Sequence, residues 1–240
     1  MVGSTAKRFY KSVLVESTGN GFFITLDGRS VKTPAGKALT LPYRDAAEVV
    51  AAEWGAQAEI IRPHTMPMTQ LANTALDRVS THRDEVCRHI LTFGETDTLC
   101  YWADGPLALI NRQRAVWQPL LDWATDKLGV RLKVTAGIRP VQQERDALSC
   151  LDHELSSMMD IELAVMAAFA SCTGSLIVPF AVRLKRLDAV EAFEVALLEE
   201  LFQAEKWGGD AEAAERRQRL REDMAIYARL LTLCQNEFVD

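Results

Sequence analysis

The segment LAVMAAFASCTGSLIVPFAV, residues 163–182, decides which fold this chain adopts. It carries no charged residue and is as long as a transmembrane helix, which needs about 20 apolar residues. However, Ser171 to Ser175 place small and polar side chains at its centre, and these make poor contacts with hydrocarbon. We therefore expect a buried element of a helical core. The pattern is compatible with one helix kinked at Pro179 or with a pair of helices broken near Gly174.

Helical patterns continue on both sides of this segment and fill the chain after Pro42. The clearest are 107–128 and 210–234, where apolar residues recur at alternating spacings of three and four and form one core-facing stripe. The complete set of predicted helices outside the uncharged segment is 44–57, 71–79, 84–93, 107–128, 144–158, 189–203 and 210–234. Alternating polarity at 130–135 predicts one isolated strand among them.

The first forty residues have the pattern of β structure instead. Asp27-Gly28 is a strong hairpin signal, because both residues tolerate the positive φ angles that tight hairpin turns require. The predicted strands around it are 11–16, 22–26, 29–33 and 38–41. Such a sheet is too small to be stable alone, so it must pack on helices.

Strands followed by helices predict an α+β protein. We expect a small N-terminal antiparallel β domain at residues 1–60 and a larger, all-helical C-terminal domain at residues 61–240. The 240-residue length suffices for a hydrophobic core without disulfides or metals.

Composition excludes several classes of function. A hydrophobic fraction of 48% rules out intrinsic disorder. A net charge of −6, from 27 basic and 33 acidic residues, argues against nucleic acid as a partner. The cysteine count is five and the spacing is irregular, which predicts reduced thiols. The N-terminus has no secretory or transit pattern, so we expect a bacterial cytoplasmic protein or an organelle protein that has already been trimmed.

Motifs for catalysis are missing from the sequence. It contains no phosphate loop, no H-E-x-x-H motif and no G-x-S-x-G motif, and its four histidines do not pair with other metal ligands. We therefore predict no cofactor, metal site or catalytic residue. Two alternatives stay open: an enzyme of unknown type using Cys87 and His89 or His153, and a membrane-anchored protein held by residues 163–182.

The segment QAEKWGGD, residues 203–210, is the most informative surface candidate. A helix should end at Gly208-Gly209, and Asp210 is placed to cap the next helix. Trp207 would then lie at a helix corner. Such a tryptophan either fills the core or anchors an interface, where tryptophan is over-represented among binding hot spots.

The order of short motifs along the chain resembles the ATP synthase assembly chaperone family that binds the α subunit of the catalytic head, the ATP-twelve family. The motifs that carry the resemblance are Arg8-Phe9-Tyr10-Lys11, Leu26-Asp27-Gly28-Arg29, Lys32-Thr33-Pro34-Ala35-Gly36, Leu39-Thr40-Leu41-Pro42, Ala52-Glu53-Trp54 with Gln57, Pro63, Met66-Pro67, Leu71-Ala72-Asn73-Thr74-Ala75, Asp77-Arg78-Val79, Asp97 to Tyr101, Trp117 with Pro119-Leu120-Leu121, Thr173-Gly174-Ser175 and Glu205-Lys206-Trp207-Gly208. The chain departs from the family pattern at Met68, Trp102 and Pro179.

The resemblance implies a bacterial assembly chaperone that is not an enzyme and needs no cofactor. It would bind the unassembled α subunit and shield the surface that contacts β, until β displaces it. It would act in the cytoplasm, as eukaryotic relatives act in the mitochondrial matrix, with neither nucleic acid binding nor stable membrane insertion. The partner-binding residues we predict are Glu205, Trp207, Gly208, Asp210 and Glu212, followed by a second face of Glu53, Trp54 and Gln57.

Overall fold

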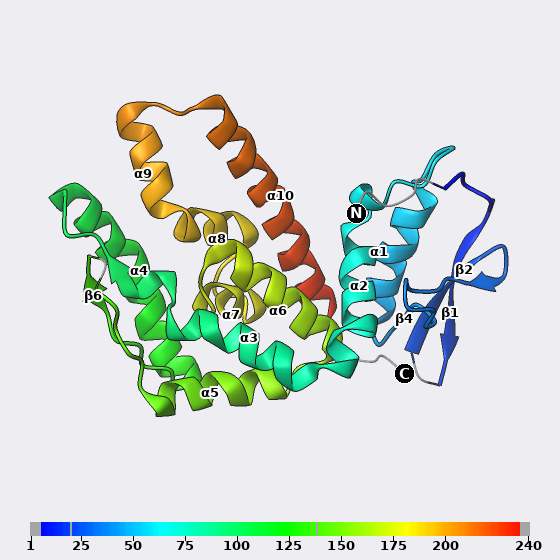
Figure 1. Cartoon of the computed structure of the whole chain (residues 1–240), viewed down its shortest axis with the longest axis horizontal. Coiled ribbons are helices and arrows are strands. Elements are labelled where there is room, and N and C mark those ends of the chain that lie inside the picture. Colours follow the sequence, from blue (N-terminus) through cyan, green and yellow to red (C-terminus); the bar gives the residue numbers. More distant parts are fainter. Residues whose placement is uncertain (1–5, 20, 138, 236–240) are drawn as a thin grey trace. The chain divides into compact units, whose positions relative to one another are not determined.

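A computed structural model describes residues 6–19, 21–137 and 139–235 (Figure 1). The chain is α+β, with an antiparallel sheet near its N-terminus and a larger helical part after it. Its contacts divide it into two compact units. The first comprises Met1–Arg83, Met159–Val165 and Arg229–Asp240, and the second comprises Asp84–Met158 and Met166–Ala228. Whether 1–60 and 61–240 fold as separate domains stays a prediction.

The sheet of the first unit is built around the strand β2 (Gly21–Leu26). β2 pairs antiparallel with β1 (Val13–Thr18) on one side and with both β3 (Arg29–Ser30) and β4 (Thr40–Leu41) on the other. The β2–β3 connection is the predicted hairpin turn, with φ of 49° at Asp27 and 77° at Gly28. The hairpin prediction is thus confirmed, although β3 and β4 are shorter than expected.

Two helices of the same unit pack on this sheet, as its small size requires. They are α1 (Arg44–Gly55) and α2 (Pro67–Asp77), joined through a short 3₁₀ turn at Pro63–Thr65. The core between the layers contains fully buried aliphatic side chains from both, such as Ile24 and Leu41 of the sheet and Val50 of α1.

The second unit is helical except for a short parallel pair of strands, β5 (Tyr101–Trp102) and β6 (Thr135–Ala136). Its helices, some of which begin or end in the first unit, are α3 (Arg83–Glu95), α4 (Leu107–Leu128), α5 (Arg145–Ser156), α6 (Asp160–Thr173), α7 (Ile177–Arg183), α8 (Ala189–Ala196), α9 (Leu198–Trp207) and α10 (Ala211–Leu233). The bounds of α4 agree with the prediction. The predicted strand at 130–135 is wrong, because pairing begins only at its last residue.

The uncharged segment is a pair of buried helices rather than a single span. α6 and α7 separate at Gly174, whose φ of 63° lies in the left-handed region that favours glycine. The segment's large side chains, including Leu163, Phe169 and Phe180, are fully buried. Within the described ranges, no helix is long and apolar enough to cross a membrane.

A buried carboxylate holds the start of α7. Asp97 Oδ2 accepts hydrogen bonds from the backbone N–H groups of Leu176 (2.8 Å) and Ile177 (3.0 Å) and from Ser175 Oγ (2.9 Å). Ser175 Oγ in turn accepts the N–H of Val178 at 3.1 Å. The next residue, Pro179, has no N–H to satisfy, so this proline fits the first turn of α7 and does not kink a longer helix.

Candidate partner-binding site

The corner between α9 and α10 presents an exposed tryptophan. Trp207 is the last residue of α9, and 75% of its surface is exposed. Of the two interpretations of this tryptophan, the core-filling one is therefore wrong. Large apolar side chains are usually buried, so an exposed tryptophan marks a candidate contact with another molecule.

The polar residues beside Trp207 shape the corner. Gly208 has φ 85°, a left-handed backbone angle that lets the chain leave α9, and a Cβ atom there would meet no other atom within 4 Å. Asp210 caps α10, since its carboxylate accepts the N–H groups of Glu212 and Ala213, both at 3.4 Å. Glu212 is exposed in the first turn of that helix.

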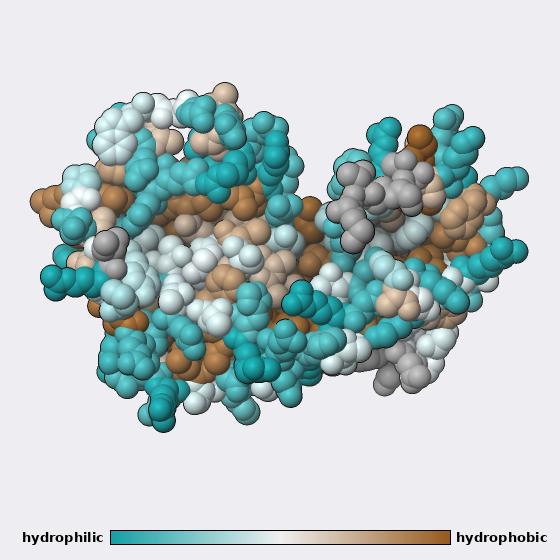
Figure 2. All heavy atoms as spheres, viewed as in Figure 1, coloured by the Kyte–Doolittle hydropathy of each residue, from teal (hydrophilic) through white to brown (hydrophobic). Residues whose placement is uncertain are grey.

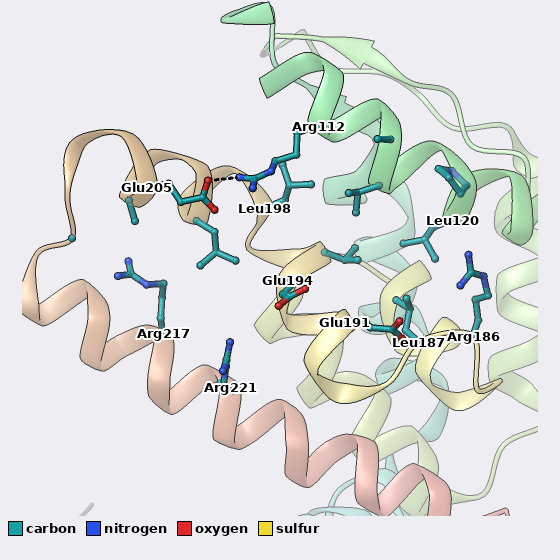
Figure 3. A pocket seen from close by; sticks show the side chains of 17 residues that line it. Arg112, Leu120, Arg186, Leu187, Glu191, Glu194, Leu198, Glu205, Arg217 and Arg221 are labelled. Atoms are coloured by element: carbon teal, nitrogen blue, oxygen red, sulfur yellow. Dashed lines mark hydrogen bonds and ion pairs between the residues drawn. The ribbon is translucent and has the colours of Figure 1, made fainter. Parts of the chain in front are cut away.

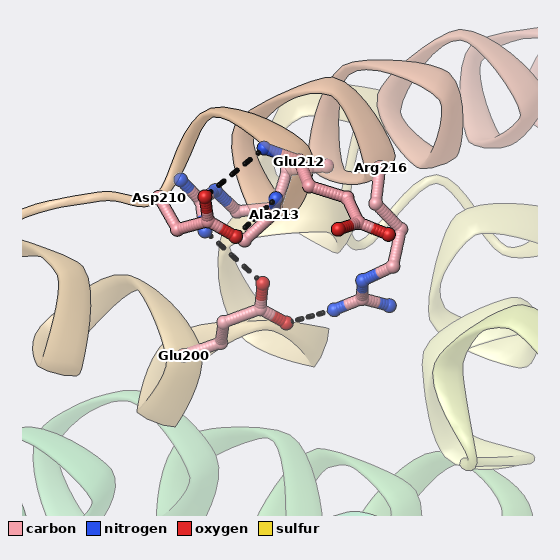
Figure 4. A network of polar contacts seen from close by, with 6 residues as sticks. Glu200, Asp210, Glu212, Ala213 and Arg216 are labelled. Carbon is pink, nitrogen blue, oxygen red and sulfur yellow. Dashed lines mark hydrogen bonds and ion pairs between the residues drawn. The ribbon is translucent and has the colours of Figure 1, made fainter.

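Ion pairs between α9 and α10 hold the two helices near this corner (Figure 4). Glu200 of α9 pairs with Arg216 through one carboxylate oxygen and with Arg217, at 3.1 Å, through the other. A single exposed ion pair contributes at most about 1 kcal/mol, but one carboxylate shared by two arginines also fixes geometry.

A groove of about 860 Å³ lies below the corner, between α4, α8, α9 and α10. Figure 1 shows α9 and α10 diverging from the corner with α8 in the space between them. The apolar residues that line the groove are Ala115, Val116, Pro119, Leu120, Leu187, Val195, Leu198, Leu201 and Ala204. Figure 2 shows hydrophobic residues in this hollow, with hydrophilic residues around it. Apolar grooves with a charged rim are typical of sites that receive a ligand or a partner segment.

Buried hydrogen bonds fix the walls of the groove. The Trp117 indole of α4 is 1% exposed and donates to the Val195 carbonyl of α8 at 3.0 Å. Gln113, also on α4, donates through Nε2 to Glu199 Oε1 of α9 and accepts the N–H of Ala103 at 2.8 Å. Partial burial raises the pKa of Glu199. Hydrogen bonds thus join α4 to both α8 and α9 at the walls of the groove.

Charged residues surround the apolar floor (Figure 3). Arg112 donates to Glu205 at 2.8 Å, which places one predicted site residue on the rim of the groove. The Arg221 guanidinium lies 4.7 Å from the centre of the Phe193 ring. Arg186 and Glu194 also line the groove and are exposed. The groove could not be predicted from local sequence patterns, because its residues come from four helices and the loops between them, far apart in the chain.

The second predicted face, in the first unit, is occupied by internal contacts. Glu53 caps α2 by accepting the N–H groups of Met68 and Thr69, both at 2.8 Å, and burial raises its pKa. Gln57 is 6% exposed and accepts the N–H of Arg62 at 2.7 Å. Glu53 and Gln57 thus each have a structural role within the first unit. A partner contact at this face stays a prediction.

Trp54 is the remaining member of that face. It is only partly exposed, its indole Nε1 is buried, and it has no hydrogen-bond partner among the described residues. Its ring lies 6.0 Å from that of Tyr10, whose hydroxyl donates to the Trp54 carbonyl at 2.8 Å.

The side chains of the enzymatic alternative do not converge. Cys87 is buried in α3, whereas His89, two positions later, is exposed and stacks edge-on against Phe93 at 5.5 Å. His153 is exposed on α5. In the part of the chain that the structure describes, no group of three potential metal ligands is present.

Comparisons with known proteins agree on one family. A family model described as ATP12 chaperone protein matches residues 7–125. The chain is 28% identical over 221 residues to "Protein atp12, mitochondrial" of Schizosaccharomyces pombe, which covers 87% of this chain and 76% of the relative. The crystal structure of Atp12 from Paracoccus denitrificans is 36% identical, with a TM-score of 0.91 over 96% of this chain and 99% of that one. This chain therefore belongs to the ATP12 chaperone family.

Proposed function

We propose that this chain is an assembly chaperone of the F-type ATP synthase that binds the unassembled α subunit. It shields the α surface that later contacts β, works without catalysis or a cofactor, and acts in the bacterial cytoplasm. Membership of the ATP12 chaperone family, at 36% identity to a solved member over nearly the whole chain, is the observation that carries this proposal.

The chemistry of the corner and groove agrees with such a role. A subunit that waits for its partner exposes an apolar surface, and such surfaces aggregate. A chaperone must cover that surface and later release it, which requires a modest interface with a few anchors and a polar rim. Trp207 provides an exposed anchor, and the ion-paired Glu205 contributes to the rim.

Co-expression with the α subunit tests the proposal directly. The α subunit alone should be insoluble or aggregated, and it should co-purify as a soluble complex when this chain is present. Addition of β should then release the chain from α. If α gains no solubility and forms no complex, the proposed function is refuted.

Replacement of Trp207 tests the predicted anchor. Most of its indole is free to be covered by a partner, so Trp207→Ala should weaken α binding at least tenfold, or about 1.4 kcal/mol. Folding stability should change by less than about 0.5 kcal/mol, because an exposed side chain contributes little to packing.

Phe9→Ala is the matched control for this variant. Phe9 is a similarly exposed aromatic residue, at 71%, but belongs to the first unit and lies outside the corner between α9 and α10. We expect wild-type affinity for α, measured by interferometry or calorimetry on purified proteins. Equal affinities for Trp207→Ala and wild type would remove Trp207 from the interface.

A further inference from the structure

The groove between α4, α8, α9 and α10 is lined by more arginines than carboxylates, and two of its arginines form no ion pair within the described residues. Arg112 is paired with Glu205 and Arg217 with Glu200. Arg186 and Arg221 line the same groove, and neither forms an ion pair with a described residue.

The carboxylates that line the groove are Glu191, Glu194 and Glu205, and neither Glu191 nor Glu194 forms an ion pair with a described residue. Glu191 is committed to the N-terminus of α8, where its carboxylate accepts the N–H of Asp188 at 2.8 Å. Glu194 is the remaining lining carboxylate, and no described cation pairs with it. The lining thus comprises four arginines and three glutamates, a formal excess of one positive charge in a chain whose net charge is −6.

Apolar surface lies directly between these charges. Figure 3 shows Arg221 and Glu194 on opposing helices, Leu198 near Arg112, and Arg186 and Leu187 toward the other end of the groove. Arg221 stays close to the Phe193 ring, which restricts its guanidinium before any ligand binds. An arginine held in this way presents a planar pair of donors suited to a carboxylate.

We propose that this groove binds a segment of the α subunit that combines apolar side chains with a carboxylate, and that Arg186 and Arg221 receive the carboxylate. The inference rests on the proposed function and names the surface and chemistry of its interaction. A peptide suits the site better than a simple anion does, because Glu194 can accept N–H groups or a cation of the same segment, whereas it would repel a free anion.

Charge reversal and a steric plug test this assignment in two independent ways. The variant Arg186→Glu/Arg221→Glu should weaken binding of the isolated α subunit at least tenfold. Ala115→Tyr, at an exposed lining position of α4, should weaken it to a similar degree by filling the groove. The matched control is Arg114→Glu, an exposed arginine of α4 outside the groove, which should bind within about threefold of wild type.

A photo-crosslinking residue at position 115 identifies the occupant. Crosslinking to an α-subunit peptide that contains apolar residues and Asp or Glu supports the proposal. Crosslinking to lipid, to a second copy of the chain or to an α peptide without a carboxylate overturns it. Unchanged affinity of both the charge-reversed and the plugged variants also overturns it, whereas a wild-type chain that never binds α refutes the proposed function itself.

Discussion

Asp97 offers the sharpest test of how the helical unit is held together. Its carboxylate is fully buried and accepts hydrogen bonds from four groups: the N–H groups of Leu99, Leu176 and Ile177 and the hydroxyl of Ser175. Both oxygens act as acceptors, and these hydrogen bonds lower the pKa of Asp97, whereas burial, the larger effect, raises it. Asp97→Ala leaves these donors without an acceptor, at about 1–3 kcal/mol for each unsatisfied group before relaxation. With about 1 kcal/mol left for each of the four donors after relaxation, we expect a loss of about 4 kcal/mol in the free energy of unfolding.

Asp188→Ala supplies the matched comparison. Asp188 also caps a helix, accepting the N–H of Glu191 at 2.8 Å at the start of α8, but it is exposed. An exposed cap contributes about 1 kcal/mol. Urea denaturation followed by circular dichroism measures both variants. If Asp97→Ala costs no more than Asp188→Ala, then burial does not strengthen the cap and the reasoning is refuted.

Two further predictions concern single positions. Gly174→Ala should lower the free energy of unfolding by at least about 2 kcal/mol more than Gly28→Ala does. Both glycines have positive φ, but only at Gly174 would the new Cβ lie 2.6 Å from Thr98 Oγ1. Thermal or urea unfolding measures both variants, and equal losses would contradict this prediction. For Glu53, burial raises the folded-state pKa above the usual 4.5, so the folded protein binds the proton more tightly than the unfolded chain does. The difference in free energy of unfolding between wild type and Glu53→Gln should therefore fall as pH rises from 4.5 through the folded-state pKa. Urea titrations at several pH values measure this difference, and an increase with pH would refute the raised pKa of Glu53.

Elements fixed by local chemistry were predictable from the sequence. The Asp27-Gly28 turn needs only two adjacent residues that tolerate positive φ, and the structure has positive φ at both. The apolar stripe of α4 ends at Gly129. The left-handed φ of 70° at this glycine terminates the helix. In both cases the deciding residues lie within a few positions of each other.

Elements fixed by distant partners were not predictable. The sequence 189–203 contains neither glycine nor proline and predicts one helix, yet the structure has α8 and α9, separated at Leu197. The carbonyl of Val195, next to this break, accepts the indole N–H of Trp117, a residue 78 positions away. The burial of Asp97 was not predictable either. Because it follows Glu95 and Thr96, its local sequence has the pattern of a solvated surface.

The candidate site shows the same division between local and distant determinants. Trp207, Gly208 and Asp210 are neighbours in sequence, so the corner could be predicted, and only the exposure of Trp207 required the structure. The groove depends on Arg186 and Arg221, which belong to segments that the sequence alone does not connect. Each of these arginines has the pattern of an ordinary exposed cation. Their significance arises because the fold places both beside one apolar floor and pairs neither with a described carboxylate, which leaves both guanidinium groups available to a binding partner.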